Sequence, residues 1–224
     1  MAKRILDICL SFLALALLAV PMMLIALAIR LGSRGRAIFR QERIGRGGKL
    51  FTMLKFRTMR ADVDPYGSSP HSSADARLTR IGRLLRETSI DELPQLLNVL
   101  VGQMSLVGPR PLYERQAAQW NDRQRRRLEV RPGITGYAQA FGRGGLTIEE
   151  KLELDVFYVD NMSLWLDLKI MARTLANIFV RRAAVYEHRY SQGADYEGQQ
   201  PPGPAQRPGE QDAKSGQNGK RNQP

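Results

Sequence analysis

The hydrophobic pattern of the chain opens with a long apolar run. Residues 8–29 carry no charged side chain, and a helix over this run is about 33 Å long, close to the thickness of a hydrocarbon core. A cleavable signal peptide is an alternative, but its apolar segment is usually shorter, and Arg30 follows this run at once. The pattern therefore predicts a membrane helix.

Two features bear on how this helix sits in the membrane. Lys3 and Arg4 precede the run and Arg34 and Arg36 follow it, so the positive-inside rule draws both ends toward the cytoplasm. Pro21 lies in the interior, where it removes a helix hydrogen bond and predicts a bend. Many spanning helices tolerate proline. The residues alone leave open whether the helix spans or enters and returns on the same side.

The next segment predicts a β-hairpin. Residues 38–44 and 50–56 flank the glycine-rich loop 45–49, which lacks the spacing of a phosphate-binding P-loop, so its glycines are interpreted as turn residues. Lys55 lies in the basic end of the second predicted strand. Residues 62–75, rich in proline, glycine and serine, predict a polar loop.

From residue 78 onward the apolar spacing predicts helices. They are expected over residues 78–86, 93–100, 113–128, 147–161 and 164 to about 182, the last capped by Ser163. Arginines line one side of the segment 113–128, which predicts a solvated or membrane-facing surface. Between these helices, residues 108–111 form a rigid proline-bounded break, residues 131–136 a turn and residues 142–145 a flexible basic loop.

Composition narrows the class of protein. The 224 residues carry a net charge of +12, to which the segment after Tyr190 contributes nothing, and this charge suits nucleic acid, anionic lipid headgroups or phosphorylated substrates. Cys9 is the sole cysteine of the sequence, so no disulfide within the chain can form, and the two histidines are too far apart for a zinc site built on histidine and cysteine. Residues 191–224 lack large apolar side chains other than tyrosine and are predicted to be disordered.

The candidate chemistry centres on the adjacent acids Asp91 and Glu92. Two neighbouring carboxylates repel when ionised, so cations or a divalent metal must compensate them. Arginines surround the pair in the sequence, at positions 80, 83, 86 and 110. This setting indicates phosphate chemistry.

A purely structural interpretation of the same stretch is a helix-capping box formed by Ser89 and Glu92. Pro94 argues against it, because proline is comfortable only at the first helical position. A helix that begins at Pro94 leaves both acids in the preceding turn, where the positive helix end favours an ionised carboxylate and an anion. Both interpretations stay open at this point.

Five motifs in one order connect the chain to a known family. They are Lys55-Phe-Arg-Thr-Met59, Ser89-Ile-Asp-Glu-Leu-Pro-Gln95, Gly108-Pro-Arg-Pro111, Arg131-Pro-Gly-Ile-Thr-Gly136 and Leu166-Asp-Leu-Lys169. With them the chain resembles the bacterial monotopic phosphoglycosyl transferases, which are polyprenyl-phosphate sugar-1-phosphate transferases. The resemblance extends from the N-terminus to about residue 185, and the size is similar to that of the minimal members.

The resemblance implies a UDP-sugar donor, a polyprenyl phosphate acceptor, usually undecaprenyl phosphate, and Mg²⁺. It implies that Asp91 attacks the sugar-bearing phosphate, releases UMP and holds the phosphosugar until the lipid phosphate displaces it, while Glu92 binds Mg²⁺. A carboxylate is a competent nucleophile toward phosphorus, and a metal ion lowers the charge repulsion. Such a reaction is the first membrane step of glycan assembly, at the cytoplasmic face of the bacterial inner membrane.

Further site residues follow from the same resemblance. Arg86 and Arg110 match positions expected to hold phosphate oxygens, to which guanidinium groups are well suited. Lys55, Arg143 and Thr135 are additional candidates, each with a structural role as the alternative.

The expected fold is α+β and mainly α. The resemblance implies that residues 1–36 form a re-entrant membrane helix with a basic flank. Residues 37–190 are expected to form a compact catalytic domain with the hairpin and interfacial amphipathic helices, and residues 191–224 a disordered tail. Relatives often carry Ser-Pro at the bend of the membrane helix, whereas this chain has Val20-Pro21, so the kink rests on proline alone.

Membrane lipids are the other expected partners. A membrane-tethered nucleic-acid binder is a rival of another class, but the sequence has no readable DNA or RNA motif, and no nucleic acid is expected. A non-catalytic scaffold that recruits partners through residues 191–224 is a second rival. The identity of the sugar, the pathway and the oligomeric state, a homodimer included, are left open.

Overall fold

Helices dominate the structure, a computed structural model that describes residues 1–63, 70, 72, 74–142 and 146–180. The elements in chain order are α1 (Ala2–Gly32), β1 (Ile38–Ile44), η1 (Arg46–Gly48), β2 (Leu50–Phe56), α2 (Arg80–Glu87), η2 (Ile90–Glu92), α3 (Gln95–Leu100), β3 (Ser105–Val107), α4 (Glu114–Ala117), α5 (Asp122–Arg125), η3 (Arg126–Glu129), β4 (Gly133–Thr135), η4 (Ala138–Gly142), α6 (Ile148–Asp160) and α7 (Leu164–Val180). The mainly helical class with little sheet is confirmed. The predicted loops at 62–75 and 142–145 lie largely outside the described residues, and the predicted tail lies wholly outside them.

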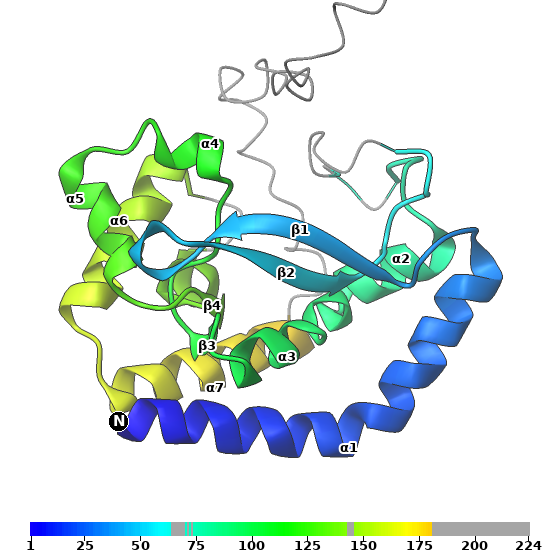
Figure 1. Cartoon of the computed structure of the whole chain (residues 1–224), viewed down its shortest axis with the longest axis horizontal. Coiled ribbons are helices and arrows are strands. Elements are labelled where there is room, and N and C mark those ends of the chain that lie inside the picture. The colour runs from blue at the N-terminus through cyan, green and yellow to red at the C-terminus, as the bar shows by residue number, and fades with distance from the viewer. Residues whose placement is uncertain (64–69, 71, 73, 143–145, 181–224) are drawn as a thin grey trace, which may run out of the picture. The chain divides into compact units, whose positions relative to one another are not determined.

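The hairpin has the predicted bounds. β1 and β2 pair antiparallel, with Ile38 opposite Phe56 and Ile44 opposite Leu50. In the connecting loop Gly47 has a φ of 66°, a left-handed conformation that favours glycine. Figure 1 shows the two strands side by side above α3.

A second pair of strands replaces part of a predicted turn. β3 and β4 are parallel, and Gly133–Thr135, expected in a turn, form β4. The Gly133 N–H donates to the Pro109 carbonyl and the Gly108 N–H to the Thr135 carbonyl, each at 2.9 Å. A side chain at Gly133 would collide with the backbone of Gly108. The glycines that suggested a turn instead allow two backbones to approach.

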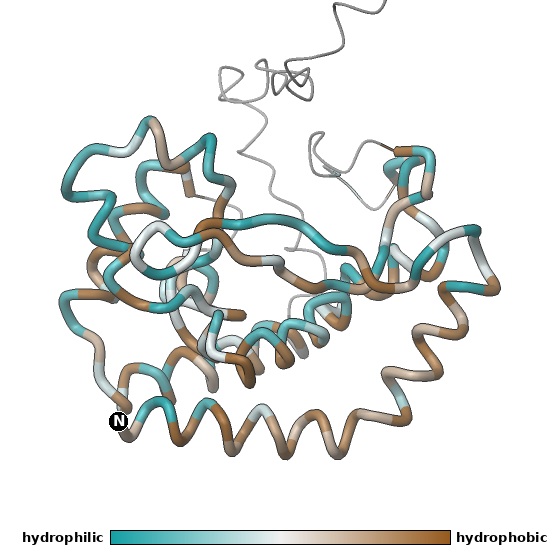
Figure 2. The backbone as a smooth tube through the Cα atoms, in the orientation of Figure 1, coloured by the Kyte–Doolittle hydropathy of each residue, from teal (hydrophilic) through white to brown (hydrophobic). Residues whose placement is uncertain are grey.

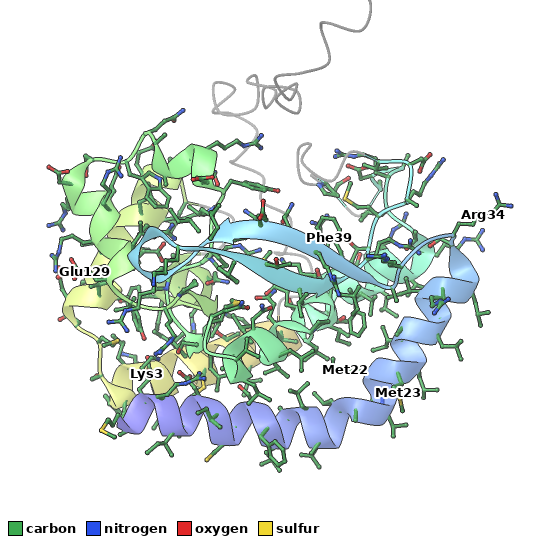
Figure 3. All side chains as sticks on the ribbon, in the orientation of Figure 1. Lys3, Met22, Met23, Arg34, Phe39 and Glu129 are labelled. Atoms are coloured by element: carbon green, nitrogen blue, oxygen red, sulfur yellow. The ribbon has the colours of Figure 1, made fainter. Side chains whose placement is uncertain are left out.

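Helix α1 is continuous through Pro21. Figure 1 shows that it bends, and Figure 3 shows Met22 and Met23 just beyond the bend. Both arms are mainly hydrophobic (Figure 2), and most of their side chains are exposed. By length and composition α1 could cross a membrane.

The first turns of α1 are attached to the rest of the protein by polar contacts. Lys3 Nζ donates to Asp167 Oδ2 of α7 at 2.7 Å, and both Asp7 oxygens accept from Ser105 Oγ of β3 at 2.8 and 3.0 Å. Arg4 donates to the carbonyls of the last residues of α3. Lys3 therefore lies against the elements above α1, as Figure 3 shows.

The far end of α1 is also attached. Ile29 is buried in a cluster with Phe56 of β2 and Leu85 of α2. Just after the helix, Ser33 accepts from Arg57 Nη2 at 2.8–2.9 Å through its hydroxyl and its carbonyl. Both ends of α1 are therefore attached to the rest of the described chain, the start through β3, α3 and α7 and the end through β2 and α2.

The helix predicted over residues 113–128 is wrong as one element, because it is divided into α4, α5 and η3. Asn121 starts a new helix: its side chain accepts from the Gln124 N–H at 2.9 Å, while the Gln124 side chain accepts from the Asn121 N–H. The predicted solvated arginine surface is also wrong for Arg127. That side chain is buried in an ion pair with Asp155, at 2.6 Å.

The two C-terminal helices begin where their sequences predict. Thr147 and Glu150 form a capping box at the start of α6. At the start of α7, the Ser163 hydroxyl accepts from the Leu166 N–H at 3.2 Å. These caps are local signals, which is why they could be found from the sequence.

Candidate active site

Asp91 and Glu92 lie in a tight turn between α2 and α3. Ser89 has a φ of 57° and its side chain makes no capping hydrogen bond, so the capping-box interpretation is wrong. The backbone is helical from the turn through Pro94, and α3 begins at Gln95. This is the second of the two arrangements that the sequence left open.

Asn98 holds this region against the hairpin. Its side chain donates to the Thr52 carbonyl at 2.7 Å and accepts from the Leu54 N–H at 3.0 Å. These two backbone groups on the outer edge of β2 therefore form hydrogen bonds with a buried amide rather than with another strand. Because Lys55 follows Leu54 directly, the same contact brings Lys55 to the acidic turn.

Glu92 is held by two cations from distant parts of the chain. Its Oε1 accepts from Lys55 Nζ at 2.8 Å and from Arg110 Nη2 at 3.3 Å. Burial alone would raise the pKa of Glu92, but the charges of Lys55 and Arg110 outweigh it and lower that pKa to about 2. Glu92 is therefore a fixed negative charge at neutral pH.

Asp91 has a different environment. It is buried, and no described residue donates a hydrogen bond to its carboxylate. Burial raises the pKa of Asp91 to about 6, against the opposing charge of Lys55, and the neighbouring Glu92 adds to the rise. At neutral pH most of this carboxylate is ionised yet has no donor to occupy its lone pairs, which is the state that a nucleophile requires.

Arg86 supplies a cation without a hydrogen-bond partner. It lies in the last turn of α2, and its charge is among those that lower the pKa of Asp91. Its Nη1 atom is buried and makes no hydrogen bond within the described part of the chain. A buried donor of this kind normally finds an acceptor, and a phosphate oxygen is a suitable one.

The position of Arg110 depends on a buried ion pair that the sequence did not reveal. The Arg110 carbonyl accepts from Arg127 Nη2 at 2.6 Å, and the same nitrogen contacts Asp155. Burial raises the pKa of Asp155 although Arg127 opposes it. Nothing in the spacing of residues 127 and 155 identifies this pair in advance.

The remaining candidates are placed differently. The Thr135 hydroxyl forms a hydrogen bond of 2.7 Å with the Thr174 hydroxyl and so joins β4 to α7. Arg143 lies outside the described residues. Pro21 belongs to α1. Of the candidates, the structure brings together Asp91, Glu92, Lys55, Arg86 and Arg110.

The acidic pair also fits the donor chemistry of Mg²⁺. Carboxylate oxygens are its usual protein ligands, and Mg²⁺ is commonly bound by one or two of them together with water and substrate phosphates. Within the described ranges no third acidic, histidine or cysteine side chain joins Asp91 and Glu92 into a larger cluster. The pair therefore suits an ion shared with a phosphorylated substrate.

Comparison with known proteins places this chain in a family. The family model for bacterial sugar transferases matches residues 1–181. The uncharacterized sugar transferase EpsL of Bacillus subtilis is 46% identical over 178 residues, 80% of this chain and 87% of that protein.

Two relatives have names that state an activity. The UDP-glucose:undecaprenyl-phosphate glucose-1-phosphate transferase of Caulobacter vibrioides is 47% identical over 184 residues, 79% of this chain and 69% of that protein. The protein of the same name from Escherichia coli is 41% identical over 194 residues, 81% of this chain and 41% of that protein.

Fold, site and relatives together define a membrane-associated phosphoglycosyl transferase. The chain belongs to the family of bacterial sugar transferases.

Proposed function

We propose that the enzyme transfers a sugar-1-phosphate from a UDP-sugar to undecaprenyl phosphate or a similar polyprenyl phosphate. The donor and acceptor classes are those in the names of the Caulobacter and Escherichia relatives. The observation that carries the proposal is the unequal acidic pair. Glu92 is held by two cations, whereas Asp91 is ionised and accepts no hydrogen bond from a described residue. The charge of Arg86, whose Nη1 has no hydrogen-bond partner within the described residues, acts on Asp91.

In the first step an Asp91 carboxylate oxygen attacks the phosphorus that bears the sugar. A new oxygen–phosphorus bond forms, the bond from that phosphorus to the bridging oxygen breaks, and UMP leaves with the electron pair. The product is a phosphosugar bound to Asp91 as an acyl phosphate. Lys55, Arg86 and Arg110 are placed to stabilise the negative charge that accumulates on the phosphate oxygens.

In the second step a phosphate oxygen of the lipid attacks the same phosphorus. The bond to Asp91 breaks, the carboxylate is regenerated, and polyprenyl-diphosphate-sugar leaves. No proton has to be removed from the acceptor, because a phosphate monoester is already anionic at neutral pH. This agrees with a site whose described residues near Asp91 are cations rather than a histidine base.

Mg²⁺ fits this site with Glu92 as its ligand and Asp91 as a neighbouring oxygen donor. Bound there, the ion would reduce the repulsion between the carboxylate and the diphosphate. Lys55 and Arg110 now compensate Glu92, and either cation is long enough to turn toward a substrate phosphate.

The proposed location is the cytoplasmic face of the inner membrane, with α1 entering one leaflet and returning. Lys3 at the start of α1 binds Asp167 of α7, and Arg57 binds Ser33 just after the end of α1, so both ends of the helix are attached to the rest of the described chain. A straight span would place these two ends on opposite sides of the bilayer. The bend after Val20 supports the re-entrant form even though a hydroxyl-bearing residue is absent at that position.

The test is intact-protein mass spectrometry of detergent-solubilised protein with Mg²⁺ and a panel of UDP-sugars, without lipid acceptor. Wild type is expected to gain the mass of one sugar phosphate and to release UMP with one of the donors. Asp91→Asn is expected to gain no mass, because an amide is a poor nucleophile. The donor that produces the adduct identifies the sugar.

The matched control is Asp62→Asn, which changes an exposed aspartate that forms an ion pair with the nearby Arg60. It should form the adduct like wild type. Donor-dependent UMP release by Asp91→Asn at the wild-type rate would contradict the role of Asp91. Absence of UMP release from wild type, even with undecaprenyl phosphate present, would contradict the proposed reaction itself.

A further inference from the structure

A second side chain beside the carboxylates has an unsatisfied donor. Gln95 is 2% exposed, and its Nε2 atom is buried without a hydrogen-bond partner in the part of the chain that the structure describes. A buried amide in this state costs free energy unless something binds to it. In native proteins such a group calls for an explanation.

The position of Gln95 relates it to the site. The backbone is helical from η2 through α3, so Glu92, Gln95 and Asn98 are spaced three residues apart along one side. The two outer members of this row both contact β2, Glu92 through Lys55 and Asn98 through the strand backbone. Gln95, in the middle of the row, makes no such bond.

Helix geometry places Gln95 about one turn after the nucleophile. Side chains of a helix lean toward its N-terminus and cover the preceding turn. The preceding turn here contains Asp91, four residues before Gln95. Arg86 of α2 also has a buried atom, Nη1, that makes no hydrogen bond within the described residues, and its charge acts on the Asp91 carboxylate. Two side chains with unsatisfied donors are therefore linked to the group proposed to attack phosphorus, Gln95 by its place one turn after Asp91 and Arg86 by its charge.

We propose that the Gln95 amide binds a non-bridging oxygen of the transferred phosphoryl group, with Arg86 as the second donor. This inference rests on the proposed function and assigns to Gln95 a direct contact with substrate. The oxygens on the attacked phosphorus are the substrate atoms nearest to Asp91, so a donor one turn away reaches them before the sugar or the uridine. A phosphate oxygen reaches the buried amide only after side chains of the site change rotamer, and such changes are common on binding.

The experiment compares the binding of UDP and of UMP, each with Mg²⁺, to wild type, Gln95→Met and Gln95→Glu. UDP retains the phosphate that would be transferred, and UMP lacks it. Gln95→Met should weaken the binding of UDP about ten- to hundredfold, the effect of losing one hydrogen bond to a charged group. It should change the affinity for UMP less than about twofold. Gln95→Glu keeps the shape of the side chain but places a negative charge beside the phosphate, so it should weaken the binding of UDP at least as much.

Thermal unfolding without ligand separates this role from a structural one. Gln95→Met removes a buried polar group that has no partner, so its Tm should equal or exceed that of wild type. The exposed Gln119 provides the matched control, and Gln119→Met should change neither nucleotide affinity nor Tm.

Three results would overturn the inference while leaving the proposed function intact. They are UDP affinity unchanged in both Gln95 variants, equal weakening of UDP and UMP, and a lower Tm for Gln95→Met. If wild type bound neither nucleotide, the proposed donor would be wrong and the role of Gln95 with it. Adduct formation by wild type distinguishes these cases.

Discussion

At the scale of single residues, the site shows how two adjacent carboxylates acquire different properties. Asp91 and Glu92 are neighbours in one turn, but only Glu92 accepts hydrogen bonds from Lys55 and Arg110. Opposite charges therefore lower the pKa of Glu92, whereas burial raises that of Asp91. Glu92 is kept as a fixed charge, and Asp91 stays available for chemistry.

The buried pair of Arg127 and Asp155 yields a prediction at the same scale. Asp155→Asn leaves a buried guanidinium without its counter-ion and should lower the free energy of unfolding by about 3–5 kcal/mol, measured by denaturant or thermal unfolding in detergent. Transfer activity should fall as well, because Arg127 holds the Arg110 carbonyl.

The control for that prediction is the exposed pair of Arg123 and Glu153, which are joined at 2.9 Å. Glu153→Gln should lower the free energy of unfolding by at most about 1 kcal/mol, as is typical of surface ion pairs. Similar losses in Asp155→Asn and Glu153→Gln would show that burial does not decide the role of the first pair.

At the scale of elements, the site depends on how closely α2 crosses the end of the hairpin. α2 carries Arg86, and its first turn packs directly on the backbone of Thr58, to which the Thr79 N–H donates at 3.0 Å. Gly82 permits this approach, since an added Cβ would overlap the Thr58 backbone. The crossing therefore requires the smallest residue at this point.

Gly82→Ala tests the crossing. The added methyl group meets backbone that cannot move aside, so we expect a loss of about 1–3 kcal/mol in the free energy of unfolding, the usual cost of overpacking. UMP release should also fall, because α2 positions Arg86.

Gly32→Ala is the matched control at the end of α1. There the added Cβ would lie 3.4 Å from a methyl group of Ile81, an ordinary contact. Since alanine favours a helix more than glycine does, stability should be unchanged or higher by up to about 1 kcal/mol. If Gly82→Ala and Gly32→Ala changed thermal stability alike, the close crossing at Gly82 would not be the cause of the stability loss in Gly82→Ala.

At the scale of the whole molecule, α1 is attached at both ends and exposed along most of its length. Its first turns bind β3, α3 and α7, and its last turns pack on β2 and α2. Figure 2 shows that hydrophobic residues predominate along both arms. If this apolar helix enters a bilayer with its end contacts intact, both of its ends lie at the same membrane face.

Cysteine labelling tests this arrangement. In a Cys9→Ser background, single cysteines replace Ala2 and Arg34, which are exposed at the two ends of α1, and Val20, exposed at the bend. A membrane-impermeant maleimide should label both end positions in inside-out vesicles and neither in right-side-out vesicles.

The cysteine at Val20 should react poorly in either preparation, because it would lie within the bilayer. Labelling of the two ends from opposite sides would contradict the re-entrant form and would require the polar contacts of Lys3 to break in the membrane.

The sequence by itself determined the features that depend on neighbouring residues. The apolar run specified α1 and Pro21 its bend. The glycine-rich loop between two predicted strands specified the hairpin, and Thr147 and Ser163 marked the starts of two helices. The acidic pair was evident for the same reason. Periodicity, caps and turns act within a few residues, so they can be identified without knowing the path of the chain.

Only the tertiary structure decided which distant groups meet. It paired Glu92 with Lys55 and Arg110, and it buried Arg127 instead of leaving it on a solvated surface. It also made a strand of residues 133–135 and left the Gln95 Nε2 atom without a partner among the described residues. Ion pairing, strand pairing and burial join segments far apart in the chain, so their outcome depends on how the elements pack.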